Sequence, residues 1–276
     1  MTQQFTDPTY LAYQYADSEK LRIRQETHAL YSEAKEDFVD WVLNVLEAQP
    51  GEVIADVGCG PGSYHAKLAA HGVQIVALDA SLGMVTDVAE GATSAQRPVR
   101  AIQANAEQLP LADDSCDRLM ANHMLYHVPD QVTALREMWR VLKPGGRVVL
   151  ATNAADNGAW LRELHVEAAT EHGYRPLRES TVARFSLSSG DLVTAVFSNA
   201  RIMVREDAFL FPSVEAVMRY YASMMVDLIE DAPADTGHRP LLLASMQRRL
   251  ESIFARQSVL RVPKAAGCFV AEKNAQ

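Results

Sequence analysis

The chain has 276 residues, of which 48% are hydrophobic and 22% charged, and its formal net charge is −9. This composition is typical of a folded globular protein and excludes a disordered chain. The acidic balance, without a run of Lys and Arg, argues against a nucleic-acid partner, because neutralising backbone phosphates needs a concentrated basic surface.

The cysteines and the apolar runs indicate where the protein works. Cys59, Cys116 and Cys268 are too few and too scattered for a disulfide framework or a zinc site with paired spacings. The N-terminus lacks the pattern of a secretory leader, and no apolar run approaches the roughly 18 residues that span a bilayer. We therefore expect a cytoplasmic protein with neither a metal nor a membrane contact.

The first predicted element is one amphipathic helix over residues 26–48, which ends at Pro50 and Gly51. Apolar residues in it recur at i, i+3, i+4, i+7 and i+8, the spacing of a single buried stripe. The residues of this stripe are Phe38, Trp41, Val42, Val45 and Leu46.

From residue 51 to about residue 153, predicted strands and helices alternate. Strands are expected at 53–57, 74–78, 99–104, 117–121 and 147–152, and helices begin near Gly62 and Ser81. A further helix carries Val132, Leu135, Trp139 and Leu142 on one face and is stopped by Pro144 and the glycines at 145–146. This alternation is typical of βαβ units in a mostly parallel sheet.

Beyond residue 153 the alternation loosens. Residues 154–183 are predicted to be helical and a short helix follows Ser189, while 202–211 and 267–272 read as strands. The sequence therefore predicts an α/β protein with a Rossmann-like, doubly wound, seven-stranded and mostly parallel sheet. Its predicted parts are an N-terminal helical gate (1–50), a core (51–211) with a helical insertion (about 154–198), a Met-rich helical lid (212–262) and the last core strand (263–276).

The strand at 53–57 runs into Gly58, Gly60 and Gly62, which lets a nucleotide-like ligand approach the backbone closely. The spacing is G-x-G-x-G, and Pro61 removes an amide donor, so binding of a pyrophosphate is disfavoured. Asp56, at the mouth of the turn, would repel phosphate and complement an ammonium and a sulfonium, although it could also merely cap the turn. The turn therefore predicts a cationic cofactor.

Asp79 closes the second predicted strand and follows Gly58 by 21 residues. This distance suits a carboxylate that accepts both hydroxyls of an adenosine ribose. NAD would use the same residue, and Asp79 could instead cap the next helix in competition with Ser81.

Five short runs in this order are similar to a known family. They are 56–62 (DVGCGPG), 78–81 (LDAS), 106–111 (AEQLPL), 124–128 (MLYHV) and 142–146 (LKPGG). Together they resemble the class I S-adenosylmethionine-dependent methyltransferases of the ubiquinone-biosynthesis type. The resemblance covers residues 53–152, and the flanks are only loosely similar.

The resemblance implies a cofactor site for S-adenosylmethionine. The glycines would pack against its methionine part, Asp79 would bind its ribose, and Asn105 with Ala106 would face adenine. The family often has Asp where this chain has Asn105, so the amide must accept through its carbonyl oxygen. Met84 could pack on adenine or serve as a core Met. The implied cofactor-binding residues are Asp56, Gly58, Gly60, Gly62, Asp79, Ala80, Met84, Asn105, Ala106, Glu107 and Asn122.

The acceptor side is expected after the fourth strand, at the carboxyl edge where ligands bind such sheets. Methyl transfer is an in-line displacement, so a general base matters only when the acceptor loses a proton of high pKa. His123, Tyr126 and His127 are the candidate catalytic residues, although His127 could be structural. Asn122 is expected to touch the methionine end of the cofactor through its backbone.

The sequence thus predicts transfer of a methyl group from S-adenosylmethionine to a small-molecule acceptor, in secondary or cofactor metabolism, by a monomer or homodimer. Relatives use an N-terminal segment as a gate, and here Tyr10, Tyr13, Tyr15, Arg22, Arg24 and His28 could close over the site. Two alternatives stay open: an NAD(P)-dependent oxidoreductase, and a protein that binds S-adenosylmethionine without turnover.

Overall fold

The computed structural model describes residues 18–177, 181–230, 232 and 236–274. Contacts divide the chain into two compact units. A helical unit is drawn from Met1–Lys35, Asp156–Thr181 and Glu206–Ala265, and a sheet unit from Glu36–Ala155, Val182–Arg205 and Ala266–Gln276. The tyrosines predicted at positions 10, 13 and 15 of a gate lie outside the described residues, and the gate and lid roles stay predictions.

A sheet of seven strands in the order β3-β2-β1-β4-β5-β7-β6 organises the described residues. The first five strands are parallel, and β7 runs antiparallel to β5. The predicted fold class is thereby confirmed. The order is that of a doubly wound sheet, 3-2-1-4-5-6, with β7 placed between the last two strands. The strands are β1 (Val53–Val57), β2 (Gln74–Asp79), β3 (Val99–Gln103), β4 (Cys116–Asn122), β5 (Leu142–Asn153), β6 (Arg201–Phe211) and β7 (Leu260–Glu272).

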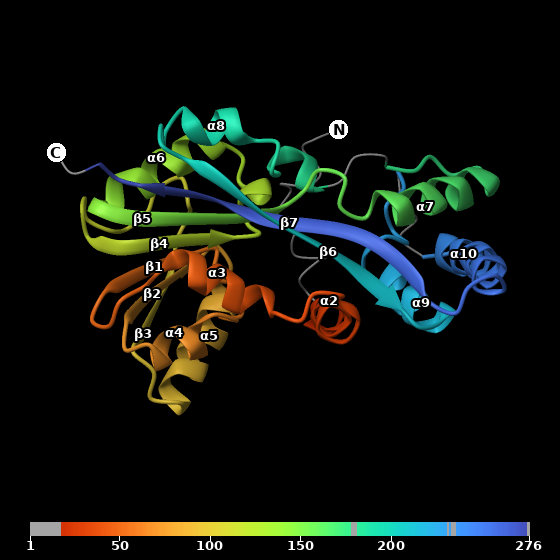
Figure 1. Cartoon of the computed structure of the whole chain (residues 1–276), viewed down its shortest axis with the longest axis horizontal. Helices are drawn as coiled ribbons and strands as arrows, with labels where there is room; N and C mark the ends of the chain where they lie inside the picture. Colours follow the sequence, from red (N-terminus) through yellow and green to blue (C-terminus); the bar gives the residue numbers. More distant parts are fainter. Residues whose placement is uncertain (1–17, 178–180, 231, 233–235, 275–276) are drawn as a thin grey trace. The chain divides into compact units, whose positions relative to one another are not determined.

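Helices cover both faces of the sheet unit (Figure 1). On one face α3 (Phe38–Leu46), α4 (His65–Ala70) and α5 (Leu82–Ser94) bury residues such as Leu46 and Leu68 against the strands. On the other face lie α6 (Gln131–Val141), α8 (Gly190–Thr194) and the 3-10 turns η2 (Leu125–His127) and η3 (Thr181–Arg184). The parallel strands are therefore buried on both sides, as their apolar sequences require.

The predicted helix over residues 26–48 is wrong, because two helices occupy this stretch. The first, α2, covers Ser18–Tyr31, and the second, α3, begins at Phe38. Between them Ser32 forms a β-bridge with Phe209, and Asp37 caps α3 by accepting from the N–H groups of residues 39 and 40. The apolar stripe lies wholly in α3. The periodicity therefore identified a real helix, and the error was to start that helix at residue 26.

The helical unit packs α2, α7 (Ala159–Glu171), α9 (Val214–Met224) and α10 (His238–Phe254) around an apolar core of its own. Val217, Tyr221 and Met225, from the predicted Met-rich face, are fully buried there. The Tyr221 hydroxyl and His165 Nδ1 share a hydrogen bond of 2.7 Å within this core. Among the helices that the structure describes, none is long and apolar enough to cross a bilayer.

Candidate functional site

The glycine turn follows β1, and its backbone N–H groups already donate hydrogen bonds within the protein. The N–H groups of Gly58 and Cys59 both donate to the carbonyl of Leu78, at 2.7 and 3.0 Å. The N–H of Gly62 donates to the Cys59 carbonyl at 3.0 Å, and Pro61 has no N–H. The first two bonds attach the turn to β2, the third closes the turn itself, and the N–H of Gly60 is the one that these bonds leave over.

The Asp79 carboxylate accepts a hydrogen bond from the N–H of Gly60. Its Oδ2 accepts from the N–H of Gly60 at 2.9 Å, and its Oδ1 accepts from the N–H of Ser81 at 2.8 Å. Ser81 in turn caps α5, as the sequence allowed. Each carboxylate oxygen retains a second lone pair, so the residue can still accept ribose hydroxyls. Every backbone N–H from residue 58 to residue 62 thus donates a hydrogen bond, and the Asp79 carboxylate lies against the turn.

The three glycines differ in the space around them, although all have positive φ. A Cβ on Gly58 would lie 2.6 Å from Cγ of Met124, and one on Gly62 would lie 2.5 Å from Nδ1 of His65. A Cβ on Gly60 would meet no atom within 4 Å. Gly60 therefore presents its bare backbone to open space, as a close-packed ligand requires.

Asp56 lies beneath the turn, on β1, and is 1% exposed. Its Oδ2 shares a hydrogen bond of 2.9 Å with Nε2 of His65, which is 3% exposed. Burial raises the pKa of Asp56, and the hydrogen bond from His65 opposes this rise. The carboxylate thus has a protein partner already.

The loop after β3 carries the residues predicted to face adenine. Asn105 Oδ1 accepts from the N–H of Glu107 at 2.9 Å and keeps one lone pair for a further donor. The Glu107 carboxylate accepts from Asn105 Nδ2 and from the N–H of Asp130. Ala106 is buried. Glu107 therefore serves to hold the loop in place.

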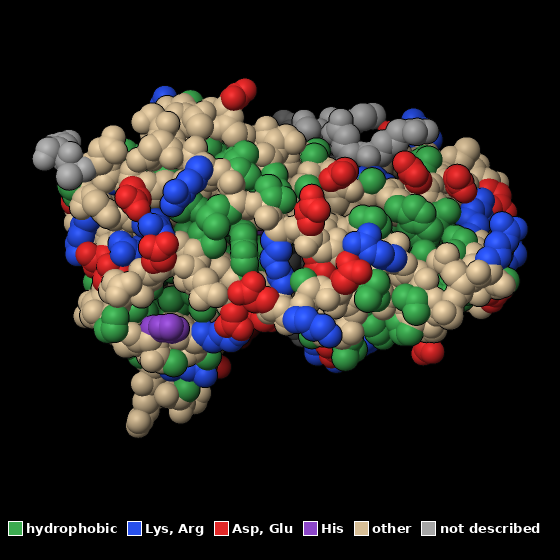
Figure 2. Space-filling model, in the orientation of Figure 1, with side chains coloured by type: hydrophobic (Ala, Val, Ile, Leu, Met, Phe, Trp, Pro, Cys, Tyr) green, Lys and Arg blue, Asp and Glu red, His purple; other side chains and the backbone are tan. Residues whose placement is uncertain are grey.

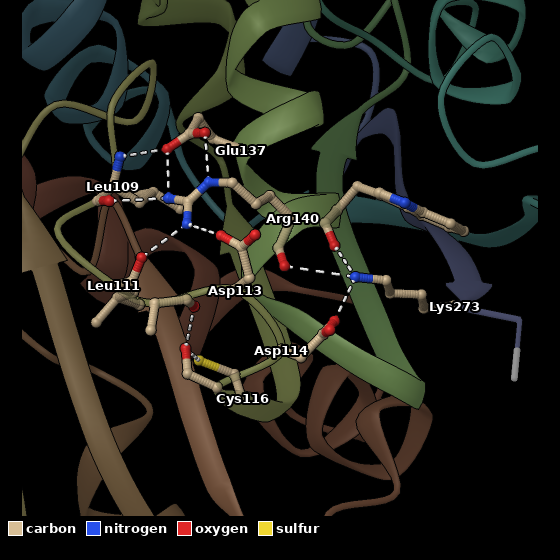
Figure 3. A network of polar contacts seen from close by, with 11 residues as sticks. Leu109, Leu111, Asp113, Asp114, Cys116, Glu137, Arg140 and Lys273 are labelled. Carbon is tan, nitrogen blue, oxygen red and sulfur yellow. Dashed lines mark hydrogen bonds and ion pairs between the residues drawn. The ribbon is translucent and has the colours of Figure 1, made fainter. Parts of the chain in front are cut away.

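An ion-pair network anchors the same loop further along (Figure 3). Arg140, on α6, donates to the carbonyls of Leu109 and Leu111 and pairs with Asp113 and Glu137. Oε2 of Glu137 also accepts from the N–H of Leu109 at 2.9 Å. The hydrogen bond from Arg140 holds the pKa of Glu137 below its usual range. Helix α6 thus fixes the segment that follows Asn105.

Asn122 ends β4 at the carboxyl edge of the sheet, beside Ala151 of β5. Its Oδ1 and Nδ2 are both buried, and neither finds a hydrogen-bond partner among the described residues. A buried amide without partners costs about 1–3 kcal/mol, and a ligand that donated and accepted hydrogen bonds there would remove this cost.

His123 follows directly and has a left-handed backbone with φ +54°. Its ring lies 5.4 Å from that of Phe38, and burial lowers its pKa to about 4. The imidazole is therefore neutral at pH 7. The rings of Tyr126 and His127 meet edge to face at 4.6 Å in the 3-10 turn that follows.

The remaining predicted residues sit at the start of α5. Ala80 is exposed, and its carbonyl accepts from Gln103 Nε2 at 3.0 Å. Met84 is half-buried in the first turn of the helix. The carboxyl ends of β1, β2 and β4 thus hold most of the predicted cofactor residues.

Sequence reasoning missed two residues of this site, His65 and Met124. Each contacts a glycine of the turn, and neither contact follows a helical or strand period. A hollow of about 470 Å³ elsewhere in the sheet unit is lined by none of the predicted cofactor-binding or catalytic residues; its lining includes Trp41, Val45, Arg147, Arg201, Met203 and Val270.

Residues 55–150 match the model of a family described as "Methyltransferase domain". Over 110 residues the chain is 44% identical to a demethylmenaquinone methyltransferase from Beutenbergia cavernae, which covers 40% of this chain and 44% of that protein. The chain thus matches less than half the length of this curated relative.

Solved structures share the fold. The YcgJ protein from Bacillus subtilis superposes with a TM-score of 0.57 at 20% identity, covering 86% of this chain and 98% of that one. The [4+2]-cyclase SpnF superposes with a TM-score of 0.56 at 17% identity, covering 93% of each chain. At these identities the likeness concerns the fold, which by itself does not determine the chemistry.

Proposed function

We propose that this chain is a class I S-adenosylmethionine-dependent methyltransferase that methylates a small-molecule acceptor, because residues 55–150 match the model of a methyltransferase domain. S-adenosylmethionine supplies an activated methyl group on a sulfonium. The proposal assigns the cofactor to the carboxyl ends of β1, β2 and β4, and the acceptor to the same edge, near residues 122–127.

The observation that carries this proposal is that every backbone N–H of the glycine turn already donates a hydrogen bond within the protein. A pyrophosphate binds such a turn through free backbone N–H groups. Here the amides of residues 58–62 are engaged, and the Asp79 carboxylate accepts from Gly60. A pyrophosphate therefore finds no free backbone donor in this turn, whereas the methionine part of S-adenosylmethionine does not depend on such donors. The turn therefore favours S-adenosylmethionine over NAD.

Two further features fit this cofactor. Gly60 faces open space, so the methionine part can lie against the backbone. Asn122 offers a buried donor and a buried acceptor that lack partners among the described residues. An amide of this kind suits a group with both donors and acceptors, such as the amino-acid end of the cofactor.

The protein's contribution to the reaction is mainly to hold donor and acceptor in line and to exclude water. His123, whose pKa is about 4, is a weak base at neutral pH and accepts a hydrogen bond more readily than a proton. Tyr126 and His127 remain the proposed residues for orienting the acceptor or receiving a proton. This favours acceptors that need little deprotonation.

A nucleic-acid acceptor is not favoured. On the face shown in Figure 2, acidic side chains of the described residues lie among the basic ones. The net charge of −9 points the same way, because phosphate backbones select basic surfaces.

Calorimetry with S-adenosylhomocysteine and with NAD tests the cofactor assignment. We expect the first to bind and the second not to; preferential binding of NAD would support an oxidoreductase and end the proposal. Incubating the protein with isotopically labelled S-adenosylmethionine and a metabolite extract tests turnover. A labelled small molecule is expected, whereas cofactor binding without any labelled product supports the non-catalytic alternative.

A further inference from the structure

A buried acid and a buried histidine link β1 to α4 beneath the glycine turn. Their side chains are 2% and 4% exposed, and Nε2 of His65 lies 2.9 Å from Oδ2 of Asp56. A carboxylate this deep needs a partner, because an unpaired buried charge costs several kcal/mol. His65 is the partner that the described residues provide.

The same imidazole also contacts the turn. The Cβ that an L-residue would place on Gly62 would lie 2.5 Å from Nδ1 and 2.9 Å from Cε1 of His65. The N–H of His65 donates to the Gly62 carbonyl at 3.0 Å. One edge of the ring therefore supports the last glycine while the other is fixed by Asp56.

The two carboxylates of the site hold the turn at two different points. Asp79 fixes Gly60 directly through its N–H, at 2.9 Å. Asp56 acts on Gly62 only through the His65 ring. The open face of Gly60 lies between these two fixed points.

We propose that His65 is a positioning residue for cofactor binding, which transmits the fixed orientation of Asp56 to Gly62 and so sets the shape of the turn. This inference rests on the proposed function, since the turn must bind S-adenosylmethionine for its shape to matter. In this role His65 acts through Asp56 and Gly62 and needs no contact of its own with the reacting atoms. It acts on affinity by keeping the turn preorganised.

The test compares substitutions at position 65 by calorimetry with S-adenosylhomocysteine, well below the melting temperature of each variant. His65→Leu removes the bond to Asp56 and should raise Kd by at least about tenfold. His65→Gln places an amide nitrogen near the position of Nε2 and should restore Kd to within about threefold of the wild type. His71→Leu is the matched control, because His71 is an exposed histidine at the end of the same helix.

A double-mutant cycle with Asp56→Leu asks whether His65 works through Asp56, since leucine has no atom that accepts a hydrogen bond from the imidazole. In the Asp56→Leu background, His65→Leu should change Kd by less than about threefold, because the contact is already absent. If His65→Leu prevents folding, His65→Asn replaces it, since the shorter amide does not reach Asp56.

Three results would overturn the inference: a Kd unchanged in His65→Leu despite a lower melting temperature, no rescue by His65→Gln, or full additivity with Asp56→Leu. The first would leave His65 a purely structural residue. Failure of the wild-type protein to bind S-adenosylhomocysteine would instead contradict the proposed function, so the two failures are distinguishable.

Discussion

The Asp79 carboxylate accepts the backbone N–H of Gly60 across 2.9 Å, joining the end of β2 to the middle of the turn that follows β1. The two residues are 19 positions apart in the sequence. One carboxylate therefore does two things at the proposed site. It shapes the turn from below, and its free lone pairs remain available for a ligand.

Asp79→Ala should weaken S-adenosylhomocysteine binding by about 1–3 kcal/mol, because acceptors for ribose hydroxyls are lost and Gly60 is released. Calorimetry measures the change. Asp87→Ala on α5, an exposed carboxylate two turns along, serves as the control and should leave Kd unaltered. An unchanged Kd in the Asp79 variant would remove this residue from the site.

Gly60→Ala and Gly145→Ala form a matched pair, since both glycines have positive φ and open space beyond Cα. Each substitution should cost about 1–2 kcal/mol of unfolding free energy from backbone strain. Only Gly60→Ala should also weaken S-adenosylhomocysteine binding, because its methyl group occupies the ligand's place. Urea unfolding and calorimetry separate the two effects; equal affinity in both variants would contradict the placement of the cofactor.

Asn122→Leu should have opposite effects on the free and the bound protein. Replacing a buried amide that lacks partners by an apolar side chain of similar size should raise the unfolding free energy by about 1 kcal/mol. The increase in melting temperature on adding S-adenosylhomocysteine should shrink, because the ligand loses the amide. Differential scanning calorimetry with and without ligand measures both. A variant that retains the full ligand-induced shift would show that the Asn122 side chain does not contact the cofactor.

Stability should fall as the pH drops, in part through His123. Its pKa is about 4 in the folded protein, whereas the unfolded value is about 6.5. The unfolded chain therefore binds the extra proton between these values, and the loss on going from pH 6.5 to pH 4 approaches roughly 3 kcal/mol.

His123→Asn, which tolerates the left-handed backbone, should reduce this slope of unfolding free energy against pH. His165 is also buried with a lowered pKa, but it is present in both proteins and cancels in the difference. The matching control is His71→Asn, which should keep the wild-type slope. Identical slopes for wild type and His123→Asn would show that His123 titrates normally.

Local patterns in the sequence predicted the helices of the sheet unit well. Ser81 was expected near the start of α5, and it caps that helix. The predicted apolar helix lies in α6, but its face was drawn one residue too far, because α6 ends at Val141 and Leu142 begins β5. These features depend on neighbours along the chain, which periodicity records. The break at residues 32–37 depends on a bridge to Phe209, and such a distant partner leaves no local signal.

The polar contacts of the site divide in the same way. The glycines, Asp79 and Asn122 were predicted as site residues because their types and their places at strand ends indicate a ligand, and these roles stay predictions. The pairing of Asp56 with His65 was not predicted, since a β1 residue and an α4 residue meet only after the turn has formed. The hydrogen bond to His65 determines the role of the Asp56 carboxylate, and the spacing of nine residues between the two does not reveal this bond.

Strand β7 lies between β5 and β6, although it comes last in chain order. During synthesis β6 therefore leaves the ribosome well before β7, the strand that lies beside it in the sheet. Until residues 260–272 emerge, β5 retains an open edge that invites pairing with other nascent chains. Sheet closure must wait for this late segment, and premature termination upstream of residue 260 would yield an aggregation-prone polypeptide.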